Sequence, residues 1–140
     1  MTMLHAERYH DISCGHRLVG HEGKCKNLHG HNYRIHFVCE ASSLDDLGRV
    51  IDFAAIKTLL CNWVEDHWDH RMLLWIEDPF YAGLRDLDPS VVGMPFNPTA
   101  ENLAQWLVTK LGPEILQGTG VRLVEVRIEE TRKCSVTYRL

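Results

Sequence analysis

The chain has 140 residues, of which 45% are apolar and 24% are charged, and its formal net charge is −4 at pH 7. This length is typical of one globular domain, residues 1–140, with a sizeable core. The net negative charge does not support nucleic-acid binding, which normally shows a basic excess. The charged start MTMLHAERYH lacks a signal peptide's apolar region, and no apolar run approaches the ~18 residues of a membrane span, so we expect no membrane association.

Cysteine and histidine content narrows the setting. The five cysteines are odd in number and scattered, which does not suit a disulfide framework. We therefore expect a cytoplasmic protein in a reducing environment. The nine histidines are many for this length, and their clustering matters more than their number.

The first two predicted elements are β-strands. Within residues 3–18, every second residue from His10 to His16 would share one face of a strand. Residues 31–41 alternate in the same way, and their aromatic and β-branched content favours a strand. One face would carry His31, Tyr33, Ile35, Phe37 and Cys39, and the other Asn32, Arg34, His36, Val38 and Glu40.

Two helices and two strands follow. Asp52 can cap a helix from about Phe53 to His67, whose buried stripe would be Phe53, Ile56, Leu60, Trp63, Val64 and His67. The four prolines of residues 76–98 predict mostly loop. Thr99 can cap a second helix, which Gly112 and Pro113 would end. The alternating stretches VRLVEVRIEE and KCSVTYRL complete an α+β domain, strand–strand–helix–helix–strand–strand, with both helices on one face of a four-stranded antiparallel sheet.

Three histidines form the candidate metal site. His29 and His31 are two residues apart, so on a strand both side chains point the same way. An antiparallel first strand would bring His16 across from them as a third ligand. Three neutral imidazoles favour zinc with an open fourth position. A His-x-His pair alone is weak evidence, and the alternative is two surface histidines on a strand.

Cys25, four residues before His29, has two interpretations. It can be a fourth ligand that closes the site. It can also be a reactive thiol, because the flanking Lys24 and Lys26 lower a thiol's pKa and favour the thiolate. The residues alone leave both open.

Two further features suggest catalytic or binding groups. His70, directly after Asp69, is typical of a base and its partner held in a turn, and the alternative is a polar helix end. Glu130 has the parity of Val124, Val126 and Ile128, so it would continue a buried face, where a carboxylate needs a partner such as a planar pair of N–H groups. The alternative for Glu130 is a strand end that emerges into water. Glu129 would lie on the polar face, and His67 is interpreted as a packed core histidine.

Six motifs together resemble the 6-pyruvoyl-tetrahydropterin synthase family, and most of all its 6-carboxy-tetrahydropterin synthase branch of queuosine biosynthesis. They run almost end to end: CGHRL, HEGKCKNLHGHNY, VIDFAAIK, WDHRMLL, FNPTAENLAQWL and VRIEET. The Cys-x-x-x-His-Gly-His spacing is the most specific of them. The segment from Ile76 to Phe96 is longer than in compact members of the family.

The resemblance implies a fold and a set of roles. The fold would be the tunnelling fold, in which three four-stranded sheets join into a barrel and two trimers stack into a homohexamer. His16, His29 and His31 would bind one zinc ion per subunit, Cys25 would be the catalytic thiol, Asp69 and His70 would assist it, and Glu130 would anchor the pterin. Thr99 is also expected to contact the substrate. Lys24, Arg17 and Lys133 are candidates for the triphosphate from charge alone.

The implied reaction converts 7,8-dihydroneopterin triphosphate to 6-carboxy-5,6,7,8-tetrahydropterin, with release of acetaldehyde and triphosphate. One alternative is a pyruvoyl synthase that stops after triphosphate loss. Another is a non-catalytic, zinc-stabilised oligomer that binds a ligand. Identifying the products formed from dihydroneopterin triphosphate discriminates among the three.

Overall fold

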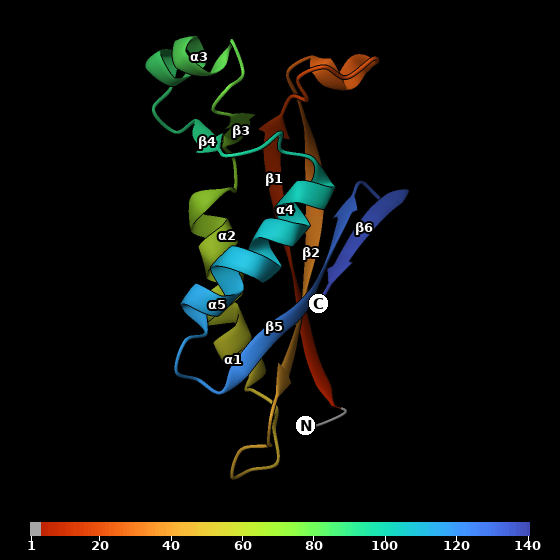
Figure 1. Ribbon diagram of the computed structural model, residues 1–140, viewed down its shortest axis with the longest axis vertical. Coiled ribbons are helices and arrows are strands. Elements are labelled where there is room, and N and C mark those ends of the chain that lie inside the picture. Colours follow the sequence, from red (N-terminus) through yellow and green to blue (C-terminus); the bar gives the residue numbers. More distant parts are fainter. Residues whose placement is uncertain (1–3) are drawn as a thin grey trace.

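The computed structural model describes residues 4–140, so Met3, where the range of the predicted first strand begins, lies outside the described part. Four long strands form the body of the sheet (Figure 1). They are β1 (His5–His16), β2 (His29–Ala41), β5 (Val121–Glu130) and β6 (Cys134–Arg139). Each pairs antiparallel with the next along the chain. This part of the fold agrees with the predicted strand order.

The sheet has six strands rather than the predicted four. β3 (Met72–Trp75) adds in parallel to the end of β1, and β4 (Val92–Met94) adds in parallel to β3, so the order is β4-β3-β1-β2-β5-β6. The sequence pattern missed both because they are only four and three residues long, too short for an alternation to show. Residues 76–98 also contain α3 (Tyr81–Leu87), so they are less irregular than their prolines suggest.

The helices cover one face of the sheet (Figure 1). α1 (Phe53–Ile56), the π turn η2 (Lys57–Cys61) and α2 (Asn62–His67) run on as one helical stretch, capped by Asp52, whose side chain accepts from the Ala54 N–H. The second stretch joins α4 (Ala100–Trp106), the π turn η3 (Leu107–Leu111) and α5 (Gly112–Ile115), with Thr99 as its cap. It does not end at Gly112 and Pro113 as predicted. Pro113 follows the π turn, where the hydrogen-bond pattern changes, and the helix continues past it.

The core lies between these helices and the sheet. Ile56, Leu60 and Val64 are fully buried, as are Leu107 and the inward residues of the central strands. The prediction was wrong for Phe53, which is 59% exposed, and for His67, which is exposed and stacks on Trp63 with ring centroids 4.1 Å apart. The π turn changes the angular spacing of side chains, so residues on either side of it do not keep one face of 3.6-residue period.

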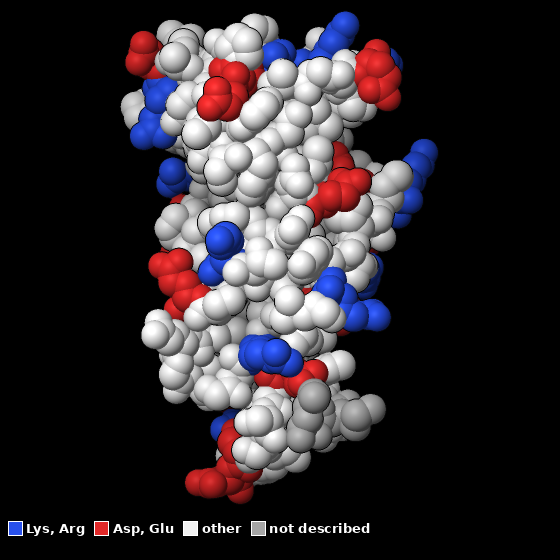
Figure 2. Space-filling view, viewed as in Figure 1, with Lys and Arg blue, Asp and Glu red and all other residues white. Residues whose placement is uncertain are grey.

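The other face of the sheet bears polar side chains, as expected, but His36 and Val38 are buried there. A bulge between Val38 and Cys39 shifts the pairing of β2 with β5. On the helix-covered face, acidic and basic side chains are interspersed and form no basic patch (Figure 2). Within residues 4–140, no helix has the length and apolar composition needed to cross a membrane.

Candidate metal and pterin site

Three histidines converge where β1 ends and β2 begins. His16 is the last residue of β1 and pairs with His29, while His31 pairs with Cys14. One ligand atom from each histidine lies within 4.8 Å of the others, and His16 is only 1% exposed. The antiparallel register therefore brings together the predicted ligands His16, His29 and His31, and this group can hold a metal ion.

Backbone carbonyls orient two of the imidazoles. The Nδ1 of His16 lies 2.7 Å from the carbonyl oxygen of Pro98, and the Nδ1 of His29 lies 2.7 Å from that of Asn27. Because a carbonyl only accepts, both rings carry the proton on Nδ1 and present a bare Nε2. Burial lowers the pKa of His31, which favours its neutral form.

The Nε2 atoms of His29 and His31 are buried without a hydrogen-bond partner among the described residues. Buried polar atoms normally have partners, and a metal ion is a partner that suits two neighbouring imidazole nitrogens. Neutral imidazoles supported by backbone carbonyls are what zinc prefers. The residues therefore fit a zinc ion, which would bind to these nitrogens.

Glu130, at the end of β5, faces the same group. Its Oε1 lies 2.8 Å from Nε2 of His31, although without hydrogen-bond geometry, and 3.5 Å from Nε2 of His16. Glu129 points to the other face, where its Oε2 lies 2.5 Å from Nε2 of His36. The two glutamates thus lie on the faces that their parity predicted.

Cys25 is on a short turn beside the histidines. The 3-10 turn η1 (Lys24–Lys26) carries it, and the thiol is partly exposed. Among the described residues, Cys25 is not part of the metal-ligand group. Burial chiefly raises the pKa of Tyr33, whose hydroxyl lies 3.3 Å from His16, and Cys25 adds to that shift, so the thiol lies in the neighbourhood of the site.

Asp69 and His70 occupy the free edge of β1, beyond its short pairing with β3. The Ser13 N–H donates to Oδ1 of Asp69 at 2.9 Å, and the His70 N–H donates to the Ser13 carbonyl at 2.6 Å. The His70 Nδ1 lies 2.7 Å from Oδ2 of Asp69, so the predicted pair forms. His70 has φ 58°, a left-handed conformation that is uncommon outside glycine and typical of functional turns.

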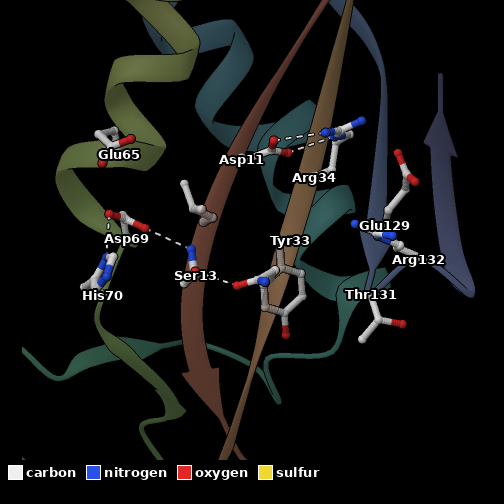
Figure 3. Close-up of a pocket in the computed structure, with 12 residues that line it drawn as sticks. Asp11, Ser13, Tyr33, Arg34, Glu65, Asp69, His70, Glu129, Thr131 and Arg132 are labelled. Atoms are coloured by element: carbon white, nitrogen blue, oxygen red, sulfur yellow. Dashed lines mark hydrogen bonds and ion pairs between the residues drawn. The ribbon is translucent and has the colours of Figure 1, made fainter.

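The Asp69–His70 pair lies on a cavity of about 830 Å³ on the helix-free side of the sheet (Figure 3). Thr131 and Arg132, from the β5–β6 turn, line its opposite side. Cys25, His16 and His29 are absent from the described residues that line it. The His70 side chain is 80% exposed. This cavity therefore holds His70 without Cys25, while a neighbouring cavity of about 620 Å³ has both His70 and His31 on its wall.

Thr99 lies next to the site but has a local role. Its side-chain oxygen accepts from the Asn102 N–H at 3.0 Å, and Thr99 follows Pro98, whose carbonyl supports His16. The sequence pattern missed the supporting groups of Pro98, Asn27 and Tyr33. Backbone carbonyls leave no trace in side-chain type, and the His16–Pro98 contact spans 82 positions. The buried parity of Tyr33 beside His31 was the one available signal.

Comparisons with known proteins agree with this geometry. The model of the 6-pyruvoyl tetrahydropterin synthase family matches residues 6–140. A protein of Rickettsia felis named 6-carboxy-5,6,7,8-tetrahydropterin synthase is 32% identical over 136 residues, 96% of this chain and 99% of its own. Other curated relatives bear the same name.

Solved structures share the fold. The 6-pyruvoyl tetrahydropterin synthase of Caenorhabditis elegans superimposes with a TM-score of 0.70 at 28% identity, over 100% of this chain and 97% of the other. An uncharacterised protein of Wolinella succinogenes gives 0.84 at 23% identity, over 97% of each chain, which shows the fold alone. The chain therefore belongs to the 6-pyruvoyl tetrahydropterin synthase family, as an enzyme of the lyase type whose relatives are named for 6-carboxy-tetrahydropterin formation.

Proposed function

We propose that the chain is a zinc-dependent lyase that converts 7,8-dihydroneopterin triphosphate to 6-carboxy-5,6,7,8-tetrahydropterin, releasing acetaldehyde and triphosphate, in the cytoplasmic synthesis of queuosine or related 7-deazapurines. The observation that carries the proposal is the meeting of His16, His29 and His31 with the inward carboxylate of Glu130. A metal-ligand group beside one half-buried acceptor suits a substrate with a hydroxylated side chain on a ring rich in N–H groups. The names of the curated relatives support the carboxy product.

His16, His29 and His31 would hold one zinc ion per subunit. When bound, zinc supplies Lewis acidity toward the hydroxyl groups of the substrate's side chain. Glu130 would accept the amino and ring N–H groups of the pterin as a bidentate carboxylate and so set its orientation. Thr99, near the Pro98 carbonyl, is a further candidate for substrate contact.

Cys25 would move protons at the side-chain carbons of the substrate. His70, oriented by Asp69, would act as a base or relay on the opposite side of the substrate. The 2.7 Å contact between Nδ1 of His70 and Asp69 leaves Nε2 free for that task.

This division of labour supports an oligomer, because Cys25 is not among the described residues that line the cavity beside His70 of the same chain. An exposed His70 on the surface of one subunit can complete the site of another. The sheet also has two edge strands, β4 and β6, and unpaired edges invite pairing between chains. We propose a homohexamer built as a dimer of trimers, with sheets joined into a barrel.

The deciding experiment is to incubate the zinc-loaded, purified protein with 7,8-dihydroneopterin triphosphate and identify the products. Release of acetaldehyde together with 6-carboxy-tetrahydropterin supports the proposal. Triphosphate loss without acetaldehyde would make the chain a pyruvoyl synthase. Binding without turnover would leave a zinc-stabilised ligand-binding oligomer.

A further inference from the structure

Arg17, the residue after His16, makes a buried ion pair with a carboxylate from a distant segment. Its Nε donates to Oδ2 of Asp78 at 2.6 Å. The Asp78 side chain is 0% exposed and that of Arg17 only 13% exposed. A carboxylate buried this far needs its cation, because an unpaired buried charge is strongly unfavourable. The buried ion pair therefore holds the two segments together, unlike the exposed ion pairs on the protein's surface.

The same guanidinium also hydrogen-bonds to the turn that carries Cys25. Nη1 of Arg17 donates to the carbonyl oxygen of Lys26 at 2.9 Å. The N–H of Leu18 donates to the carbonyl oxygen of Cys25 at 2.8 Å. Two successive residues after β1 thus hold two successive carbonyls of the turn, one on Cys25 and one directly after it.

Few other contacts tie the turn to the rest of the fold. η1 is three residues long and contains no buried residue. Its remaining hydrogen bonds are local: the Gly23 N–H donates to Nδ1 of His21 at 2.8 Å, the Lys26 N–H to the Gly23 carbonyl at 3.4 Å and the Asn27 N–H to the Lys24 carbonyl at 2.9 Å. Arg17 and Leu18 therefore supply the hydrogen bonds that tie the Cys25 backbone to the end of β1.

Backbone hydrogen bonds hold Asp78 in place, and Asp78 together with the Phe80 ring fixes the orientation of Arg17. Its Oδ1 accepts from the Phe80 N–H at 2.8 Å, and its own N–H donates to the Trp75 carbonyl at 2.9 Å. The Phe80 ring lies under the guanidinium, with Cζ 3.8 Å from the ring centroid. A planar guanidinium held by a buried carboxylate and an aromatic face has one orientation, which lysine could not reproduce.

We propose that Asp78 is a positioning residue of the active site: through Arg17 it sets the place of the turn that presents Cys25 to the substrate. This assigns a positioning role to the segment from Ile76 to Phe96, which contains Asp78. It also leaves the Nε and Nη1 of Arg17 engaged within the protein rather than free for the triphosphate. The inference rests on the proposed role of Cys25 as the reactive thiol.

The test is Asp78→Asn, which keeps the shape and removes the charge that holds Arg17. We expect kcat to fall about 10- to 100-fold with KM changed much less, since a displacement of about 1 Å can cost 100-fold. The rate of Cys25 alkylation by iodoacetamide at fixed pH, followed by peptide mass spectrometry, should change in parallel. Bound zinc should stay at the wild-type level. A merely structural role for Asp78 would lower thermal stability without moving the alkylation rate of the folded protein.

Asp45→Asn is the matched control. Asp45 also pairs with an arginine, Arg49, at 2.8 Å and accepts backbone N–H groups, but in an exposed turn. It should leave kcat, KM and Cys25 alkylation unchanged. If Asp78→Asn does not fold, Phe80→Leu provides the same test, because it keeps the ion pair and removes only the ring beneath the guanidinium.

Two outcomes separate the inference from the proposed function. If a folded Asp78→Asn protein retains wild-type kcat and wild-type Cys25 alkylation, the positioning role is wrong. If the wild type does not turn over dihydroneopterin triphosphate but Asp78→Asn still alters Cys25 alkylation, the proposed reaction fails and the positioning role stands.

Discussion

Glu130 and His31 meet across two neighbouring strands, with Oε1 of the glutamate 2.8 Å from Nε2 of the histidine. The contact arises because Glu130 pairs with Tyr33 in the β2–β5 register, two residues beyond His31 on the same face. The preceding carboxylate, Glu129, is directed to His36 on the opposite face. One strand end therefore presents two glutamates to two different environments, which provides a matched pair for mutagenesis.

Glu130→Gln should weaken pterin binding while leaving bound zinc unchanged. The amide replaces one acceptor oxygen with a donor that would oppose the pterin's own N–H groups. Loss of a hydrogen bond to a charged group typically costs ~1.5–3 kcal/mol, or about 10- to 150-fold in Kd. Titration with a pterin, together with metal analysis, measures both effects. Glu129→Gln is the control and should leave pterin affinity unchanged. The reverse ranking would exclude Glu130 as the pterin anchor.

Replacing His16, His29 or His31 with alanine should remove most of the bound zinc and abolish activity. Each change leaves two imidazoles, too few for a tight zinc site. His36→Ala, on the opposite face of β2, should keep its zinc even if stability falls, because Glu129 and Glu7 lose a buried partner. Metal content after dialysis measures this. Equal zinc loss from His36→Ala would contradict the assignment of the site to the helix-covered face.

The buried thiols should resist alkylation in the folded protein. Burial raises the pKa of Cys14 and of Cys39 to about 12, and it also raises the pKa of Cys61. A thiol of pKa 12 is about one part in 10,000 thiolate at pH 8, and the thiolate is the reactive form. Iodoacetamide at pH 8 should therefore modify only Cys25 and the exposed Cys134. Modification of Cys14 at a comparable rate, with the fold intact by circular dichroism, would contradict the buried placement.

The sequence predicted the three-histidine group because side chains alternate between the two faces of a strand with a period of two residues, and strand pairing preserves that alternation. A two-residue spacing determined that His29 and His31 share a face, and antiparallel pairing with β1 brought His16 opposite. The same alternation separated Glu130 from Glu129. The helix caps Asp52 and Thr99 were also predicted correctly, because capping depends on residue type and short-range spacing.

Features that depend on long-range contacts could not be predicted. The sequence predicted Asp78 to be a loop residue, and only the fold brings it to Arg17, 61 positions away. The π turn η2 interrupts the helical period between Phe53 and His67 and leaves no signal in composition, which is why these two residues were misplaced. The place of His70 follows from the hydrogen bond between Asp69 and the Ser13 N–H at the edge of β1, a contact across 56 positions that the sequence did not reveal.

Asp69 should make stability depend on pH in the acid range. Burial alone would raise the pKa of Asp69, but hydrogen bonds from the Ser13 N–H and His70, with Glu65 also in contact, hold it below its usual range. A lowered folded-state pKa stabilises the protein above the unfolded value of about 3.9, and that contribution is lost as the pH falls through the folded pKa. The stability difference between wild type and Asp69→Asn, from urea unfolding, should thus be present at pH 7 and shrink below about pH 4. A difference that stayed constant with pH would exclude a charged role for Asp69.

Cys25→Ala distinguishes a catalytic thiol from a fourth zinc ligand. If the thiol is catalytic, the variant should keep its full zinc complement, because three imidazoles and a water still complete a tetrahedron. It should also bind substrate, through zinc and Glu130, yet lose about 100- to 10,000-fold in turnover, the usual contribution of a general acid–base group. Metal analysis, substrate binding and single-turnover rates measure the three effects separately. Cys134→Ala, which removes an exposed thiol in β6, is the control and should retain activity. Loss of zinc on Cys25→Ala would instead make the thiol a ligand, and a closed four-ligand site has no open position for a substrate hydroxyl.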